Sequence, residues 1–148
     1  GYISQVAGLN GGTTIAHGVA IECARGGSGD NILQGNELDN RLYGLGGSDK
    51  LYGSSGADWL SGGGGKDLLY CGSDFAQDRV FARSTDIVLQ FDRGEDVLDL
   101  SATAARSVAV STIADGRYLV NVQTDSDAAA EWAFEVRGER PALADFWF

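Results

Sequence analysis

Residues 26–70 read, in blocks of nine, GGSGDNILQ, GNELDNRLY, GLGGSDKLY, GSSGADWLS and GGGGKDLLY. Position one is always glycine, at Gly26, Gly35, Gly44, Gly53 and Gly62. Position six is Asn31, Asn40, Asp49, Asp58 or Asp67, and position eight is Leu33, Leu42, Leu51, Leu60 or Leu69. A flexible glycine-rich linker has no use for a leucine fixed at one position, so the period predicts a folded repeat.

The repeat divides into a loop and a strand. Glycines in positions one to six suit turns with positive φ and exposed carbonyls, and positions seven to nine form a short strand that points only position eight inward. Successive strands then alternate between two parallel sheets around a leucine spine, so that one turn takes 18 residues. The sequence therefore predicts an all-β fold, a parallel β-roll. Its core is thin, and burial alone is not expected to offset the ordering entropy of the loops.

Stacked loops predict bound calcium. Loops 18 residues apart lie one strand spacing apart, ~4.8 Å, and enclose carbonyl and position-six oxygens. Such a cage suits Ca²⁺, which takes six to eight oxygens, better than Mg²⁺, which dehydrates reluctantly, or Zn²⁺, which prefers nitrogen and sulfur. The loops that begin at 26 and 44, 35 and 53, and 44 and 62 form the pairs. Roughly four ions would cancel most of the net charge of −10.

The candidate ligands are loop carbonyls and position-six side chains. They are Gly26, Gly27, Ser28, Gly29, Asn31, Gly35, Glu37, Asn40, Gly44, Leu45, Gly46, Gly47, Asp49, Gly53, Ser54, Ser55, Gly56, Asp58, Gly62, Gly64 and Asp67. The alternative for any one acid is a solvated turn residue. Asp49 is expected to contact two ions and Asp67, at the end of its ladder, one. The loop at 35 lacks the glycine-rich middle and is expected to bind loosely.

Composition excludes several classes of protein. Twenty-one acids against 11 bases would repel nucleic acid, and no apolar run approaches the ~20 residues of a membrane span, so we expect no membrane insertion. The chain starts at Gly1 and has no methionine, which we interpret as a piece of a longer protein. Cys23 and Cys71 would lie roughly 13 Å apart along the roll, too far for a disulfide.

The repeats match G-G-x-G-x-D-x-U-x, the calcium-binding repeat of RTX proteins. Beyond them, residues 9–22 resemble the run before the first repeat in serralysin-type secreted zinc metalloproteases. Residues 78–81 and 86–101 resemble that family's C-terminal β-sandwich segment, with Gln90 where aspartate is usual. The resemblance implies that the Ala20 carbonyl and the Glu22 carboxylate join a calcium site. It also implies N-terminal turns of the roll over 1–25, the roll over 26–71, and an antiparallel β-sandwich cap over 72–148.

The C-terminal part carries strand patterns and a tail motif. Strands are expected over 108–113, 118–122 and 132–136, with a turn at Asp115–Gly116. Residues 125–131 resemble a degenerate calcium loop. The last four residues, 145–148, resemble a type I secretion signal, although a hydrophobic tail docked on the sandwich would look the same. The resemblance implies a type I ABC transporter and a missing N-terminal catalytic domain as partners, and an extracellular location.

No catalytic or organic-cofactor site is predicted. The single histidine, His17, cannot supply the three zinc ligands of such a protease, and the cysteines lack a histidine partner. The leading hypothesis is a non-catalytic calcium-binding and secretion module of a secreted serralysin-like metalloendopeptidase. The alternatives are an R-module-like roll of a mannuronan epimerase type of enzyme, and a piece of an RTX adhesin or toxin. Residues 9–22 favour the protease.

Overall fold

The computed structural model describes residues 4–5, 11–14, 22–83, 85–124 and 132–148, and in these ranges the protein is built of β-strands arranged in two sheets. The first sheet contains, in spatial order, β1 (Ser4–Gln5), β3 (Cys23–Arg25), β5 (Arg41–Gly46), β7 (Trp59–Gly64), β9 (Arg79–Phe81), β11 (Val97–Asp99) and β15 (Phe146–Trp147). The second contains β12 (Ser107–Ala114), β13 (Arg117–Gln123), β14 (Trp132–Gly138), β10 (Ile87–Phe91), β8 (Leu68–Tyr70), β6 (Lys50–Tyr52), β4 (Asn31–Gln34) and β2 (Gly11–Thr14). Two 3₁₀ turns, Ser101–Thr103 and Leu143–Asp145, follow β11 and precede β15.

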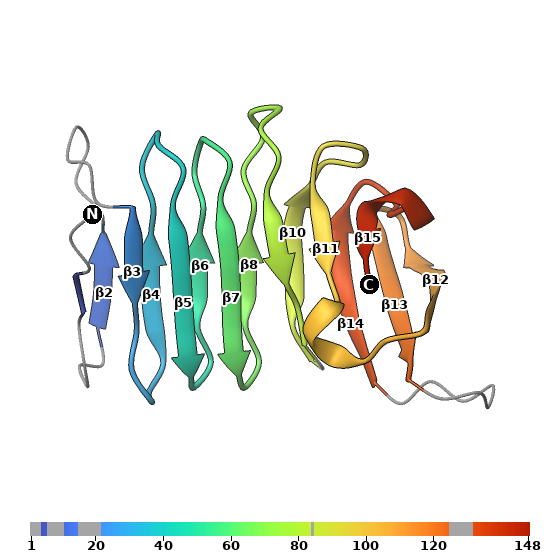
Figure 1. Ribbon diagram of the computed structural model, residues 1–148, viewed down its shortest axis with the longest axis horizontal. Coiled ribbons are helices and arrows are strands. Elements are labelled where there is room, and N and C mark those ends of the chain that lie inside the picture. The colour runs from blue at the N-terminus through green and yellow to red at the C-terminus, as the bar shows by residue number, and fades with distance from the viewer. Residues whose placement is uncertain (1–3, 6–10, 15–21, 84, 125–131) are drawn as a thin grey trace.

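The parallel roll predicted from the nine-residue period is confirmed. From β3 to β8, consecutive strands alternate between the sheets, and neighbours within each sheet pair in parallel with partners 18 residues apart, as Leu42 with Leu60 and Leu33 with Leu51. The strands stand side by side from the N-terminal to the C-terminal end of the molecule (Figure 1). No helix in the described ranges is long and apolar enough to cross a membrane.

The leucine spine lies between the sheets. All five position-eight leucines are at most 1% exposed, because this position alone points inward from each short strand. Outward-facing aromatic rings stack along the sheets instead, with centroids 4.4 Å apart for both Tyr52–Tyr70 and Trp59–Phe81. The alternation that the sequence predicts is therefore present in both sheets.

The roll continues beyond the glycine-rich repeats. β9, β10 and β11 pair in parallel with the strands before them, and Val80, Val88 and Leu98 extend the spine with no exposed surface. These strands lie in the segments that the resemblance assigns to a sandwich. The parallel pairing crosses the proposed domain boundary after residue 71 without a break.

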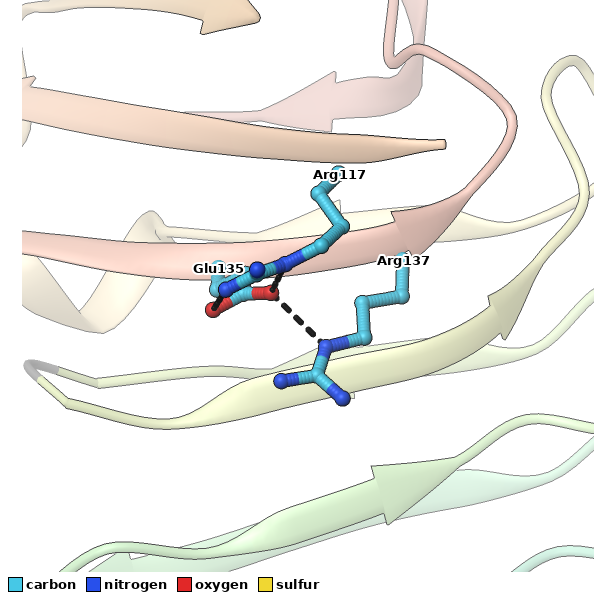
Figure 2. Close-up of polar contacts among 3 residues, drawn as sticks. All are labelled: Arg117, Glu135 and Arg137. Atoms are coloured by element: carbon cyan, nitrogen blue, oxygen red, sulfur yellow. Dashed lines mark hydrogen bonds and ion pairs between the residues drawn. The ribbon is translucent and has the colours of Figure 1, made fainter. Parts of the chain in front are cut away.

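An antiparallel unit closes the second sheet. β12, β13 and β14 pair antiparallel, as the strand patterns predict, with Gly116 at φ 63° in the turn between β12 and β13, and β14 joins β10 in parallel. Glu135 on β14 lies between the guanidinium groups of Arg117 and Arg137 and bonds to both (Figure 2). This ion pair network spans β13 and β14.

The C-terminal tail is docked as a strand. Phe146 pairs with Leu98 of β11 and is buried, and the Arg79 guanidinium lies 3.9 Å from the centroid of the Trp147 ring while it pairs with Asp99. The Asp145 carboxylate accepts the N–H groups of Gly94, at 3.1 Å, and Ala142, at 2.7 Å. The tail therefore completes the first sheet.

Candidate metal-binding ladders

The position-six side chains form two buried columns, one beside each sheet. The first ladder is Asn40, Asp58, Asp78 and Asp96, before β5, β7, β9 and β11. The second ladder is Asn31, Asp49, Asp67 and Asp86, at or before β4, β6, β8 and β10. Every member is at most 5% exposed. Acidic side chains are almost never this deeply buried without partners, so the carboxyl groups of each ladder need hydrogen-bond donors or a counter-charge.

Backbone hydrogen bonds link the rungs within each ladder. In the second ladder the N–H of Asn31 donates to Asp49 Oδ1 at 2.7 Å, and the N–H of Asp49 donates to Asp67 Oδ1 at 2.8 Å. In the first ladder the N–H of Asn40 donates to Asp58 Oδ1, also at 2.8 Å. One oxygen of each aspartate therefore holds the preceding turn, which fixes the spacing of the loops.

The ladders are longer than the repeat predicts. Asp67 was expected to end its ladder, and this is wrong, because its N–H donates to Asp86 Oδ1 at 3.1 Å. Asp58 likewise donates to Asp78 Oδ1 at 2.8 Å, and Asp78 to Asp96 Oδ1 at 3.1 Å. Counting in nines missed these three aspartates because the steps to Asp78 and Asp86 are 20 and 19 residues. The sequence feature that still identifies a ladder residue is an aspartate two residues before a buried residue of the spine, as in Asp78-Arg79-Val80.

Three buried oxygens have no hydrogen-bond partner among the described residues, namely Oδ2 of Asp49, Asp58 and Asp67. Each lies against the position-one glycine of its own loop, so that a Cβ on Gly44, Gly53 or Gly62 would overlap it. For two of these loops, a backbone carbonyl of the next stacked loop also lies close to the position-one glycine. The Gly62 carbonyl lies close to Gly44, and the Cys71 carbonyl lies close to Gly53. At Asp49 and Asp58, carboxylate and carbonyl oxygens thus converge, and no hydrogen-bond donor from the described residues reaches Oδ2.

Burial makes these carboxyl groups costly to ionise. Loss of solvation raises the pKa of Asp58 to about 7, and neighbouring carboxylates add to the effect although the Asn40 N–H opposes it. The same cause raises the pKa of Asp49 to about 6, of Asp78 to about 8, of Asp86 to about 7 and of Asp96 to about 6, and raises that of Asp67. A cation between the loops would supply the missing counter-charge.

The atoms that could bind a metal at these three positions are all oxygens, which fits a hard cation such as Ca²⁺. The ladders of buried aspartates are consistent with calcium-binding repeats. Loop stacking is present as predicted: the N–H of Gly46 donates to the Gly27 carbonyl at 3.1 Å, and that of Ser55 to the Asn36 carbonyl at 3.2 Å. The side chains of Glu22 and Glu37, by contrast, are exposed. Ala20 and residues 125–131 lie outside the described residues.

One end of the first ladder includes a thiol. Cys71 occupies position one, where the repeats have glycine, and its sulfur and carboxylate oxygens of Asp78 and Asp96 lie within 4.8 Å of one another. Burial, with the nearby carboxylates, raises the pKa of the Cys71 thiol, which hydrogen-bonds to Asp96. Both cysteines are free.

Comparison with known proteins gives a family and a set of similar solved structures. The family model described as Peptidase M10 serralysin C terminal matches residues 1–133. The AlgE6R3 subunit of the Azotobacter vinelandii mannuronan C5-epimerase is 29% identical with a TM-score of 0.65, over 82% of this chain and 79% of that chain. The AlgE6R2 subunit of the same enzyme is 26% identical with a TM-score of 0.52, over 76% of this chain and 89% of that chain. None of the curated proteins matches.

Proposed function

The chain belongs to the serralysin C-terminal family of peptidase M10, a non-catalytic module of metalloproteases, and we propose that it is a calcium-folded module. In this proposal it supports the type I secretion and the stability of a secreted serralysin-like metalloendopeptidase. The observation that carries the calcium assignment is the set of three partnerless buried oxygens, on Asp49, Asp58 and Asp67.

Calcium would couple to folding through these oxygens. Ordering the glycine-rich loops costs conformational entropy, and burying ionised carboxylates without a counter-charge adds to that cost. An ion that bridges stacked loops would offset both terms, so its binding free energy would become folding free energy. The proposed ligands are the three carboxylates with the loop carbonyls predicted from the sequence, and the proposed number of ions is roughly four.

Weak calcium affinity would separate the states inside and outside the cell. Calcium sites of extracellular modules typically have Kd values of about 10⁻⁴ to 10⁻³ M and would stay empty in the cytosol. The module would then pass a type I ABC transporter unfolded and fold outside. The last four residues, 145–148, are the proposed export signal, and a catalytic domain on the N-terminal side is the proposed partner.

A calcium titration of the whole chain tests the calcium assignment. We expect little β signal by far-ultraviolet circular dichroism in excess EDTA, and a cooperative gain on addition of Ca²⁺ but not of equal Mg²⁺. Asp58→Ala is the test variant and Asp39→Ala is its control, since Asp39 is an exposed acid in the neighbouring loop. Full β signal in EDTA, or equal responses to the two metals, would contradict the proposal.

A second candidate function is binding of an acidic sugar polymer, which the likeness to the mannuronan C5-epimerase subunits favours. Arg41, Trp59 and Arg79 lie in register across β5, β7 and β9 and line a groove of about 630 Å³. A guanidinium–aromatic row suits a chain of carboxylate-bearing sugars, although Glu22 and Glu37 also line the groove. Retention on immobilised mannuronan that Arg41→Ala abolishes would support this function, and no retention would refute it.

A further inference from the structure

Cys71 occupies position one of its loop, where the five repeats before it have glycine. We propose that the Cys71 thiolate and the carboxylates of Asp78 and Asp96 form a binding site for a thiophilic divalent cation of the Zn²⁺ type. This site differs from the proposed calcium sites in its ligands and in the metal that it prefers. The proposal goes beyond the calcium function, because it needs only the folded roll.

The repeats before Cys71 leave no room for a side chain at position one. In each of them, a Cβ on the position-one glycine would overlap an oxygen of the position-six side chain in the same loop. The loop at 71 is longer, because Asp78 follows Cys71 by seven positions whereas Asp67 follows Gly62 by five. The longer loop accommodates a side chain, and Cys71 has no exposed surface there.

The sulfur of Cys71 lies beside carboxylates from two rungs of the first ladder. Its Sγ, one oxygen of Asp78 and one oxygen of Asp96 all lie within 4.8 Å of one another, and the two aspartates are 2% and 3% exposed. The N–H of Asp78 donates to Asp96 Oδ1 at 3.1 Å and holds the two rungs together. Three groups that can each become an anion therefore share one buried place, and a shared cation would supply their counter-charge.

A buried oxygen on the preceding rung points to a cation on independent grounds. Asp58 is 2% exposed, and its Oδ2 has no hydrogen-bond partner within the described part of the chain. This oxygen lies against Gly53, where the Cys71 carbonyl also approaches, and the Asp58 N–H donates to Asp78 Oδ1 at 2.8 Å. Asp58 Oδ2 and the Cys71 carbonyl are thus candidates to complete the set of four ligands that Zn²⁺ takes.

The sulfur determines which cation this place prefers. Ca²⁺ binds through oxygen, whereas a thiolate selects softer ions such as Zn²⁺, with a Zn–S distance of about 2.3 Å. In the metal-free chain the Cys71 thiol hydrogen-bonds to Asp96. Metal binding forms a bond from sulfur to the metal and releases the thiol proton to solvent, so it needs no oxidant or reductant. The alternative is a buried thiol that only fills space.

Cadmium is the probe, because a bond between Cd²⁺ and a thiolate gives an ultraviolet charge-transfer band that oxygen ligands do not give. The three ligands are buried, so the metal must be present while the loops are still open. The reduced whole chain is unfolded in metal-free urea, mixed with equimolar Cd²⁺ and folded by dilution. Saturating calcium is included if circular dichroism shows that folding needs it. We expect the folded chain to show the band and excess Zn²⁺ to remove it.

The two cysteines provide matched variants. Cys23 lies on β3 and outside the cluster, so Cys23→Ser is expected to keep the band while Cys71→Ser loses it. Asp96→Asn is expected to raise the Cd²⁺ midpoint at least ~10-fold. Asp39→Asn, which removes the charge of an exposed aspartate, is expected to leave that midpoint unchanged.

Four results would overturn the proposal. They are a folded parent chain without the band, a band in Cys71→Ser as strong as in the parent, a band of equal strength in urea, and equal midpoints for Asp96→Asn and Asp39→Asn. The first would leave Cys71 as a thiol that only fills space, and the third would show binding by thiols without a built site. Should Cys71→Ser not fold, Cys71→Gly restores the residue of the repeats, and the same comparison decides.

Discussion

Asp58→Asn is expected to stabilise the calcium-free protein and to destabilise the calcium-loaded one. Asp58 is 2% exposed, its Oδ1 accepts the Asn40 N–H, and its Oδ2 has no hydrogen-bond partner in the part of the chain that the structure describes. Asparagine keeps Oδ1 and replaces the partnerless oxygen with an amide donor on the side where the Cys71 carbonyl approaches Gly53. The variant therefore makes the position-six side chain of the loop at 53 a neutral amide, as Asn31 and Asn40 are in the loops at 26 and 35.

The magnitude follows from the pKa of Asp58, which burial raises from 3.8 to about 7. A raised pKa in the folded state means that the contribution of this group to stability is fully present below pH 3.8 and is lost as pH rises through about 7. Roughly three pKa units at ~1.4 kcal/mol each make the ionised group cost about 4 kcal/mol at pH 8 without calcium. Asparagine avoids that cost, so its advantage should reach this size at pH 8 and vanish near pH 4.

The assay is the β signal by circular dichroism in EDTA at pH 8 and pH 4, and urea unfolding at pH 8 with saturating calcium. Asp39→Asn is the control, because it removes the same charge from an exposed aspartate and keeps the oxygen that accepts the Ala57 N–H at 2.9 Å. If Asp58→Asn has no more β signal than Asp39→Asn in EDTA at pH 8, the reasoning is refuted. It is also refuted if calcium fails to reverse the order.

Two further predictions concern packing and the ion pair network. With calcium bound, Gly94→Ala should lower the free energy of urea unfolding by ~1 kcal/mol, which is the cost of the backbone conformation alone. Gly65→Ala should lower it by at least ~2 kcal/mol more than that. Both glycines have positive φ, but a Cβ on Gly65 would overlap the Gly47 carbonyl of the stacked loop while one on Gly94 meets nothing within 4 Å, so equal losses would contradict the stacking. Hydrogen bonds from two arginines lower the pKa of Glu135 to about 2, so its contribution is present above pH 4.5 and lost as pH falls through about 2. Glu135→Gln should cost ~1 kcal/mol at pH 7, allowing for solvent screening of the exposed arginines, and the difference in urea midpoint should close by pH 2.

The sequence predicts the roll well because one residue per repeat decides it. Leu33 and its equivalents fix which face is inside, and the period fixes the 18-residue turn. The prediction fails where the loops change length, since the extra residues before Asp78 and Asp86 break the count although the packing still accepts them. It fails again at Leu45 and Ser54, because the sequence gives no glycine to mark their positive φ. The partnerless oxygens depend on those peptide orientations and so could not be predicted from the sequence.

The C-terminal tail combines a proposed export signal with the last strand of the first sheet, and this changes how the signal must be tested. Deleting residues 145–148 would remove buried Phe146 and the Asp145 hydrogen bonds, so folding and export would fail together. Phe148 is 49% exposed and follows the paired residues of β15, so Phe148→Asp changes the signal and spares the strand.

We expect Phe148→Asp to reduce export through a type I transporter while the calcium midpoint of the purified protein stays unchanged. Leu143→Asp is the control, because Leu143 is 74% exposed and lies outside the last four residues. Undiminished export of Phe148→Asp would refute the signal. A shifted calcium midpoint would show instead that this residue acts by packing, since a signal read only in the unfolded chain has no reason to alter the folded one.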